Sequence, residues 1–387
     1  MTAALKRSLK WIDHTVGRLV GPRRVLFDVR TPVNAAILRP IIRAIDGEGE
    51  TDGKIMVEQE RDDVRVLLQR EGWAARLVPR QAALRQRWDL YVNADPWGAP
   101  WLPRCARRLN FFHGVAGKYD LDNPAGLPIG FETYDRIAFV NEDRMRRYVA
   151  AGIIGPEQAA LVGYPKLDAL VSGQYSGAAE RRALGLDPSR PVVLYAPTYS
   201  TASSLHLAGE AIVTTLLGAG FNVIVKLHDR SLDTDSRYTG GIDWRRRFAA
   251  LRQPRFVFAE CDDASPLLAA ADLMVTDHSS IGFEFLVLDR PLLVFDAPEL
   301  AAAARINPDK IALLRRTADV VAKPAALVAA ARSALADPRR RSTERCEVAR
   351  LMFYRPGGAT ARALRVVRAL LEAPAVGAAI RTATEAA

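Results

Sequence analysis

The sequence predicts an α/β protein with two doubly wound parallel sheets, each in a domain of its own. The first observation is length, because 387 residues make about two domains of the usual ~100–200 residues. The second is that short apolar stretches alternate with longer stretches of helical periodicity, which is typical of βαβ units. The third is a Gly/Ser-rich stretch at 171–190, "VSGQYSGAAERRALGLDPSR", which interrupts the alternation and indicates a linker.

The first series of strands predicts an N-terminal domain over residues 21–172. Two stretches near its start, "NAAILRPIIRAID" and "RDDVRVLLQREG", carry apolar residues three to four positions apart and are expected to be helices. The expected strands are 24–30, 54–60, 89–95, 108–114, 136–142 and 159–165.

The second series predicts a C-terminal domain over residues 190–345. Its expected strands are 191–198, 221–229, 255–260, 272–277 and 291–296, with helix candidates at 203–218 and 263–270. Residues 346–371 are helical in pattern with a break at "PGG", and residues 372–387 are expected to form a loose tail.

Residues 1–20 predict a basic amphipathic helix. Apolar side chains recur at helical spacing, and Lys and Arg occupy the other faces. Such a helix can lie in an anionic lipid interface, or it can pack on the domain with its charges in water. The formal net charge of +10 likewise has two interpretations: the protein is attracted to polyanions, or its basic surface is simply solvated.

Several classes of protein are disfavoured by what the sequence lacks. It has no apolar run of ~18 residues and no signal-peptide core, so neither a membrane span nor secretion is expected. Three widely spaced cysteines suit a reducing compartment, and the predicted location is the cytoplasm. No P-loop or GxGxxG follows the first strand, which argues against a mononucleotide kinase and an NAD enzyme. The D-x-D at 233–235 lies in a polar loop, so no metal site is expected.

Ligands of open α/β sheets bind beyond the carboxyl ends of the strands, and polar residues gather at these ends. In the first domain, "FFHGVAGK" supplies His113, Gly114 and Lys118. Imidazole exchanges protons near neutral pH, so His113 could take a proton from an attacking hydroxyl, although a lone histidine is more often structural.

The second domain supplies Thr198 after one strand and Lys226 with His228 after the next. His228 and Lys226 could bind phosphate oxygens of a leaving group. Two histidines at strand ends, one in each domain, are a better signal than either alone.

The stretch "VTDHSSIGFEF" carries further candidates: Thr276, Asp277, Ser279, Ser280 and Glu284. The two serines stand where a helix begins, so they could hold a phosphate or simply cap the helix. Glu284 is expected to be buried, which favours a ligand such as ribose or an ion-pair partner, because an unpaired buried carboxylate is costly.

Six motifs, spanning roughly residues 108–362, resemble those of CDP-glycerol glycerophosphotransferases of the teichoic-acid polymerase type. They occur in the family's order: "FFHGVAGK", "LVGYPKLDAL", "VVLYAPTYS", "VIVKLHD", "ADLMVTDHSSIGFEFLVLDRPLLVFD" and "YRPGGATAR". The resemblance implies a GT-B fold: two Rossmann-like domains, with a C-terminal helix crossing back to the first.

By motif match, the resemblance assigns His113 as the base that activates the acceptor and His228 as the stabiliser of the donor phosphate. Ser279 and Ser280 would hold donor phosphates, Glu284 the ribose, and Arg362 would lie where the returning helix meets the cleft. No cofactor and no metal are implied beyond the nucleotide-activated donor.

The sequence departs from the family pattern at several positions, which bears on the identity of the donor. Asp229 stands where the family has Pro, Tyr199 and Ser200 follow the YAPT-like turn, and Gly357 replaces an Asp. His278 stands where the family often carries a larger aromatic residue.

The predicted function is transfer of glycerol phosphate from CDP-glycerol to a hydroxyl of a glycan or lipid-linked acceptor. The enzyme is expected in the cytoplasm, either free or peripheral on the inner face of the plasma membrane. One alternative is a GT-B glycosyltransferase with a UDP- or CMP-sugar donor, and a related one is a sugar-nucleotide epimerase. A nucleic-acid or lipid-surface binding protein is the remaining class. Basic residues interleaved with aromatic ones are few, so no nucleic-acid partner is expected.

Overall fold

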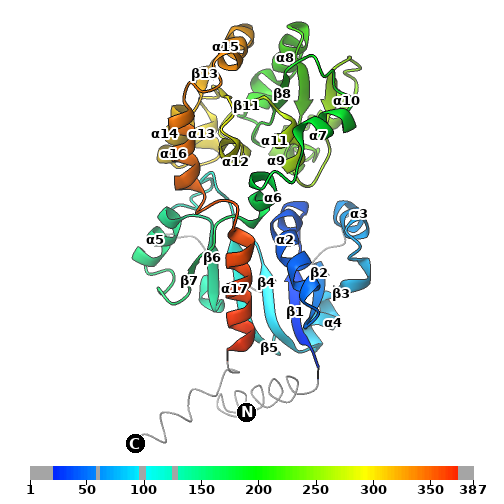
Figure 1. Cartoon of the computed structure of the whole chain (residues 1–387), viewed down its shortest axis with the longest axis vertical. Coiled ribbons are helices and arrows are strands. Elements are labelled where there is room, and N and C mark those ends of the chain that lie inside the picture. The colour runs from blue at the N-terminus through cyan, green and yellow to red at the C-terminus, as the bar shows by residue number, and fades with distance from the viewer. Residues whose placement is uncertain (1–20, 58–61, 96–101, 124–129, 374–387) are drawn as a thin grey trace, which may run out of the picture. The chain divides into compact units, whose positions relative to one another are not determined.

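The computed structural model describes residues 21–57, 62–95, 102–123 and 130–373 (Figure 1). The predicted helix over 1–20 and nearly all of the predicted tail over 372–387 therefore lie outside the described residues. The chain divides into two compact units. The first comprises Met1–His113, Pro124–Lys166 and Gly358–Ala387, and the second comprises Gly114–Asn123 and Leu167–Gly357.

The first unit is a parallel sheet with connecting helices. Its strands are β1 (Arg23–Asp28), β2 (Thr51–Val57), β3 (Leu77–Pro79), β4 (Trp88–Asn93), β5 (Cys105–Phe112), β6 (Arg136–Phe139) and β7 (Ala159–Leu161). Its helices are α2 (Pro32–Glu48), α3 (Asp62–Arg70), α4 (Arg80–Arg85), α5 (Glu142–Ala150) and α17 (Ala359–Glu372).

The order of this sheet is β3-β2-β1-β4-β5-β6-β7, and every pairing is parallel. The chain runs outward from β1 to β3 and then returns to β4 on the other side of β1. The strand order therefore reverses between β1 and β4, and ligands of doubly wound sheets bind beyond the carboxyl ends at such a switch point.

The core of the first unit explains why its strands read as continuous apolar runs. All six residues of β4 are buried, as expected for a parallel strand covered on both faces. Beyond β4, Phe112 packs edge-to-face against Phe131, Phe139 and Tyr148, with ring centroids 5.1, 5.8 and 5.1 Å away. Phe112 directly precedes His113 in the chain, so this cluster anchors the backbone on which His113 stands.

The second unit has the same plan. Its strands are β8 (Val192–Tyr195), β9 (Asn222–Val225), β10 (Phe256–Phe258), β11 (Leu273–Thr276), β12 (Leu292–Phe295) and β13 (Asp319–Val321). Its helices are α6 (Asp168–Val171), α7 (Gly177–Ala183), α8 (Ser204–Gly218), α9 (Ser236–Thr239), α10 (Trp244–Ala249), α11 (Ser265–Ala270), α12 (Ser280–Phe285), α13 (Leu300–Ala303), α14 (Pro308–Arg316), α15 (Pro324–Ala336) and α16 (Ser342–Met352).

The second sheet has the order β10-β9-β8-β11-β12-β13, again with parallel pairings. Here the strand order reverses between β8 and β11. Its core joins buried residues of these strands to apolar faces of α8 and α15. The predicted fold class, α/β with two Rossmann-like domains of GT-B type, is confirmed.

The C-terminal helix α17 belongs to the first unit, as the predicted return of this helix requires. It lies beside α2 and packs on β4 and β5 (Figure 1). The chain leaves α16 through a turn at Gly357, whose φ of 90° is in the left-handed region that glycine adopts readily.

The segment Gly114–Asn123 lies in the second unit, whereas the sequence placed it in the first. Backbone hydrogen bonds account for the difference: the Tyr119 N–H donates to the Ala304 carbonyl at 3.0 Å, and the Asn307 N–H donates to the Gly117 carbonyl at 3.0 Å. The Asn307 side chain also donates to Asp122 at 3.2 Å. These partners are about 190 residues away along the chain, so local patterns could not reveal them.

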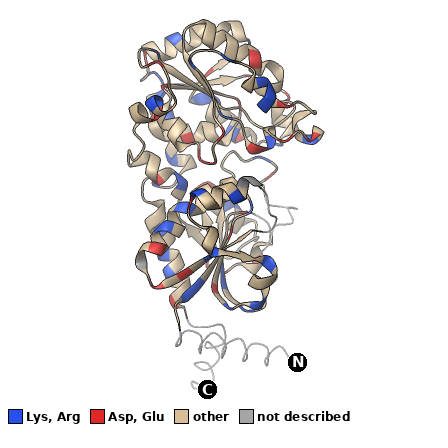
Figure 2. Ribbon diagram, turned by 90° about the vertical axis from the view of Figure 1, so that its right-hand side faces the viewer, with Lys and Arg blue, Asp and Glu red and all other residues tan. Residues whose placement is uncertain are grey.

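Charged residues of both signs are spread over both units (Figure 2). Many basic side chains near the surface have acidic partners, for example Arg245 with Glu260 at 2.8 Å and Arg247 with Glu210 at 3.0 Å. Exposed pairs of this kind stabilise the fold little, but they neutralise part of the positive charge. Among the described residues, no helix is both long and apolar enough to cross a bilayer.

The packing around Gly117 predicts that one added methyl group will strongly lower the stability of the fold. Gly117 has a φ of +61°, and a Cβ there would meet Asp122 Oδ2 at 2.2 Å. We expect Gly117→Ala to lower the free energy of unfolding by about 2–4 kcal/mol, from left-handed strain plus the clash. Urea denaturation measures the change.

The matched control is Gly185→Ala in the same unit. Gly185 has a φ of +66°, and no described atom lies within 4 Å of the position that a Cβ would take. The substitution should therefore cost only about 1–2 kcal/mol of backbone strain. Equal losses in the two variants would contradict the close packing of Gly117 against Asp122.

Candidate functional site

The switch point of the second unit is organised by the carboxylate of Asp277. Asp277 follows β11 and is fully buried. Its Oδ1 accepts from the Thr198 N–H at 2.9 Å, and its Oδ2 accepts from the Ser204 N–H at 3.1 Å and the Ser204 hydroxyl at 2.9 Å. The carboxylate thus fixes the loop after β8, whose strand is paired with β11. All three of these hydrogen bonds come from the protein itself, so the Asp277 carboxylate serves to hold this loop in place.

The residues on either side of this carboxylate are also hydrogen-bonded within the protein. The Thr276 hydroxyl donates to the Ala196 carbonyl at 2.6 Å. The Thr198 hydroxyl accepts from Lys118 Nζ at 2.9 Å. The sequence motifs predicted that Lys118, Thr198 and Asp277 belong to one site. Within the second unit, these three residues do lie together.

Burial lowers the pKa of Lys118 to about 8, and the nearby charge of Asp277 only partly opposes this. The fold therefore stabilises the ammonium less well than water does. An anion beside Lys118 would restore the missing stabilisation.

Ser279 and Ser280 stand at the start of α12, as predicted. Ser279 occupies the N-cap position, but its hydroxyl makes no capping hydrogen bond. Both serines are half-buried, and Glu284 on the same helix is buried, with 5% of its surface exposed. Since helix capping does not use the Ser279 hydroxyl, the interpretation of Ser279 as a simple cap loses its physical basis.

His228 and Lys226 follow β9. The His228 Nδ1 accepts a hydrogen bond from the Arg230 N–H at 3.1 Å, which in the neutral ring puts the proton on Nε2. The His228 ring lies 4.3 Å from that of Tyr199. Lys226 Nζ donates to the Leu227 carbonyl at 2.6 Å and lies 3.9 Å from Asp229, the residue that replaces the family's Pro.

His113 directly follows β5 in the first unit, and its ring is held in the opposite tautomer. Its Nδ1 contacts the carbonyl oxygen of Ala94. A carbonyl can only accept, so Nδ1 carries the proton and the lone pair of the neutral ring is on Nε2. The buried Arg144 donates to the His113 carbonyl at 3.3 Å and lies over the Phe112 ring at 5.0 Å.

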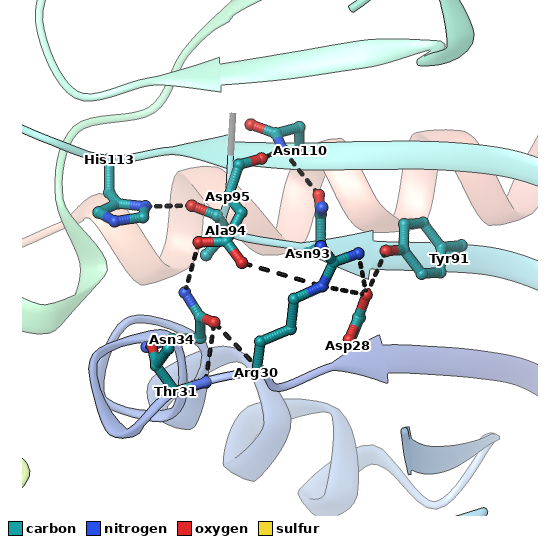
Figure 3. A network of polar contacts seen from close by, with 10 residues as sticks. All are labelled: Asp28, Arg30, Thr31, Asn34, Tyr91, Asn93, Ala94, Asp95, Asn110 and His113. Carbon is teal, nitrogen blue, oxygen red and sulfur yellow. Dashed lines mark hydrogen bonds and ion pairs between the residues drawn. The ribbon is translucent and has the colours of Figure 1, made fainter. Parts of the chain in front are cut away.

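A buried polar network, which the sequence did not predict, occupies the switch point of the first unit (Figure 3). Asp28 at the end of β1 is fully buried. It accepts from the Tyr91 hydroxyl at 2.6 Å and from Arg30 at 2.9 and 3.0 Å. Burial raises the pKa of Asp28, and Arg30 opposes the rise.

The network continues to the segment that holds His113 (Figure 3). Asn34 at the start of α2 donates to the Asp95 carboxylate at 3.2 Å. Asn110 on β5 donates to Asn93 Oδ1 at 2.7 Å and to the Asp95 carbonyl. These bonds fix the backbone on both sides of Ala94, whose carbonyl orients the imidazole.

A weak sequence signal for this network existed. "FDVRTPVN" at 27–34 places an Asp at a strand end, an Arg two residues on, and a Thr that caps a helix through the N–H of Asn34. This stretch contains no glycine-rich turn, the usual signal for a binding site after the first strand. The contacts to Asn93 and Asn110 depend on the strand order and could not be predicted from spacing.

Arg362 lies on α17 in the first unit, and its Nε donates to the Val162 carbonyl at 2.6 Å, just beyond β7. The D-x-D residues serve locally: Asp233 accepts from the Asp235 N–H at 2.9 Å, and Asp235 caps α9. In the described part of the chain, no three His, Cys, Asp or Glu side chains group as a metal site.

Comparison with known proteins decides the family. The family model for CDP-glycerol:poly(glycerophosphate) glycerophosphotransferase matches residues 132–367. The chain belongs to this family. The match covers α5, all of the second unit from Leu167 on, and most of α17. No curated protein sequence matches the chain significantly.

Solved structures show the same fold at low identity. The wall teichoic acid polymerase TagF is 15% identical with a TM-score of 0.65, over 95% of this chain and 98% of that one. A UDP-GlcNAc 2-epimerase from Neisseria meningitidis, bound to UDP-GlcNAc, is 12% identical with a TM-score of 0.57, over 89% and 99% of the two chains. A putative UDP-N-acetylglucosamine 2-epimerase from Listeria monocytogenes is 14% identical with a TM-score of 0.59.

The lowered pKa of Lys118 predicts a pH-dependent stability. Between about pH 8 and the unfolded value of 10.5, the unfolded chain holds a proton that the folded chain has lost, so stability rises with pH across this window. We expect the wild type to gain on the order of 1 kcal/mol relative to Lys118→Met between pH 7 and 9.5. Urea denaturation at both pH values measures this, and a constant difference would contradict it.

The network around Ala94 predicts that Asn110 orients His113. We expect Asn110→Ala to lower the free energy of unfolding by about 2–3 kcal/mol, because buried acceptors lose their donor. It should also move the ring ¹⁵N chemical shifts of His113 toward exchange between the two tautomers, as NMR of labelled protein would show.

Asn222→Ala is the matched control. Asn222 is equally buried and donates to the Asp187 and Arg190 carbonyls at 2.8 and 2.9 Å, in the other unit. It should destabilise similarly while the His113 signals stay in place. His113 signals that are unchanged in Asn110→Ala would remove Asn110 from this role.

Proposed function

We propose that this chain transfers glycerol phosphate from CDP-glycerol to a hydroxyl group of a glycan or lipid-linked acceptor, in the synthesis of a cell-envelope polymer. Family membership supports the reaction class. The observation that carries the chemistry is the pair of strand-end histidines, which backbone hydrogen bonds hold in opposite tautomers.

The tautomers suit two different roles. With its proton on Nδ1, His113 offers an Nε2 lone pair, as a general base needs. With its proton on Nε2, His228 offers an N–H donor, as a phosphate oxygen that gains charge needs. Neither role requires a change of tautomer before reaction.

In the proposed step, the acceptor hydroxyl oxygen attacks the β-phosphorus of CDP-glycerol and a new P–O bond forms. The bond from the β-phosphorus to the bridging oxygen breaks, and CMP leaves with that oxygen. The acceptor proton passes to Nε2 of His113. Phosphoryl transfer of this kind depends mainly on positioning and charge stabilisation.

The donor is proposed to bind beyond β8 and β11 in the second unit. Ser279 and Ser280 would hold its phosphates and Glu284 its ribose. Lys118 and Lys226 would supply positive charge, and Thr198, Thr276 and Asp277 would shape the loop. The half-buried Lys118, whose ammonium is poorly compensated, supports an anionic ligand here.

The remaining parts of the proposal concern partners and place. We propose no cofactor besides the donor, no catalytic metal and no nucleic-acid partner. The enzyme would work in the cytoplasm, where its basic segment 1–20 would keep it at the inner face of the plasma membrane near a lipid-linked acceptor. Arg362 and Gly114 would support the acceptor side and the turn after His113.

A donor assay tests the function. Purified protein with membranes as the source of acceptor should release CMP from CDP-glycerol, and EDTA should leave the rate unchanged. Release of UDP from a UDP-sugar, or of CMP from a CMP-sugar, would favour the alternative of a GT-B glycosyltransferase. Conversion of a UDP-sugar without any acceptor would favour an epimerase.

His113→Ala should lower kcat by about 10²–10⁴-fold, the usual contribution of a general base. The matched control is His206→Gln, since His206 accepts from Trp244 at 3.3 Å and Gln can accept in its place. This control should keep full turnover. Full activity in His113→Ala, with CMP still released, would overturn the assignment of His113 as the base.

A further inference from the structure

His278 is a buried histidine at the switch point of the second unit to which the proposed chemistry gives no role. It stands between Asp277 and Ser279 in the turn from β11 to α12, and only 4% of its surface is exposed. Its Nδ1 is buried and, among the described residues, has no hydrogen-bond partner.

A second unpartnered polar atom belongs to the loop that Asp277 holds. The Ser203 hydroxyl is buried and has no partner in the described part of the chain. Ser203 precedes Ser204, which donates to Asp277 through both its N–H and its hydroxyl. The two orphaned atoms therefore belong to residues next in sequence to Asp277 and to its partner Ser204, in the segments that follow the strand ends where ligands of doubly wound sheets bind.

Packing alone gives no reason for a histidine at this position. A buried ring nitrogen without a partner costs free energy, which an apolar ring of similar size would avoid. An unsatisfied group of this kind in a native protein calls for an explanation. A bound ligand that supplies the missing hydrogen-bond partner would provide it.

The charges around His278 indicate which ligand. Asp277, Asp296, Arg315 and Lys118 all lie within its electrostatic reach. Arg315 is paired with Asp296 at 2.8 Å, and the oxygens of Asp277 accept three hydrogen bonds. The charge of Lys118 is the one left poorly compensated, which favours an anion. Burial lowers the pKa of His278, so the ring is neutral at pH 7 and can present one N–H.

We propose that His278 is a donor-binding residue whose Nδ1–H hydrogen-bonds a diphosphate oxygen of the nucleotide-activated donor. This inference rests on the proposed function and adds to it a contact that the serines at 279 and 280 do not provide.

Two substitutions separate binding from packing. His278→Phe keeps an aromatic ring and removes the ring nitrogens, and His278→Asn keeps an N–H donor near the place of Nδ1. Calorimetric titration of CDP into the wild type and both variants should show about 10-fold weaker binding for His278→Phe and a recovery of most of the loss in His278→Asn. Cytidine affinity should be the same in all three.

Thermal unfolding without ligand distinguishes a binding role of His278 from a structural role, because loss of a structural residue would lower the melting temperature. Because the orphaned nitrogen is gone, His278→Phe should melt at the same temperature as the wild type or higher. The matched control is His206→Phe in the same unit, where the lost ring nitrogen is the acceptor of the hydrogen bond from Trp244. It should lower the melting temperature and leave CDP affinity unchanged.

Each result decides the proposal. Unchanged CDP affinity in His278→Phe, or a lower melting temperature without recovery in His278→Asn, would overturn it. Equal losses for cytidine and CDP would place the contact on the nucleoside and overturn the diphosphate assignment. If the wild type bound neither CDP nor UDP, the proposed function itself would fail, whereas wild-type binding with an unaffected His278→Phe would remove only this inference.

Discussion

The three hydrogen bonds of the buried Asp277 carboxylate are the constraint on which the second unit's candidate site depends. Asp277 directly follows one strand of the switch point, and its partners Thr198 and Ser204 follow the neighbouring strand. Without these bonds the loop after β8 would have buried N–H groups with no acceptor, a costly arrangement. Because the loop is fixed, the Thr198 hydroxyl can receive Lys118, and the segment that carries Lys118 can dock.

The first unit meets the same need with more residues. Its switch point is filled by a network that runs from Asp28 through Arg30 and Asp95 to the backbone at Ala94 (Figure 3). Buried polar groups are stable only when their partners are present. The consequence for chemistry is that His113 is oriented by main-chain atoms, which in turn are held by side chains of three different strands and one helix.

Both histidines show how a backbone can select the tautomer of an imidazole. A carbonyl beside one ring nitrogen of His113 and an N–H beside one ring nitrogen of His228 fix opposite tautomers. The residue type is the same, and neither flanking sequence alone distinguishes a base from a donor. The difference lies in which main-chain group the fold brings to Nδ1.

The sequence alone determined the fold class and the parallel character of both sheets, and it predicted that strand-end residues such as Thr198, His228 and Asp277 belong to one candidate site. These follow from apolar periodicity and from motif order, which are local properties of the chain. Tertiary structure alone decided that Gly114–Asn123 joins the second unit, that the Asp277 carboxylate is hydrogen-bonded within the protein, and that Nδ1 of His278 has no partner among the residues the structure describes. The physical reason is that hydrogen-bond partners at a switch point come from strands adjacent in space and distant in sequence, and no local pattern records which of them meet.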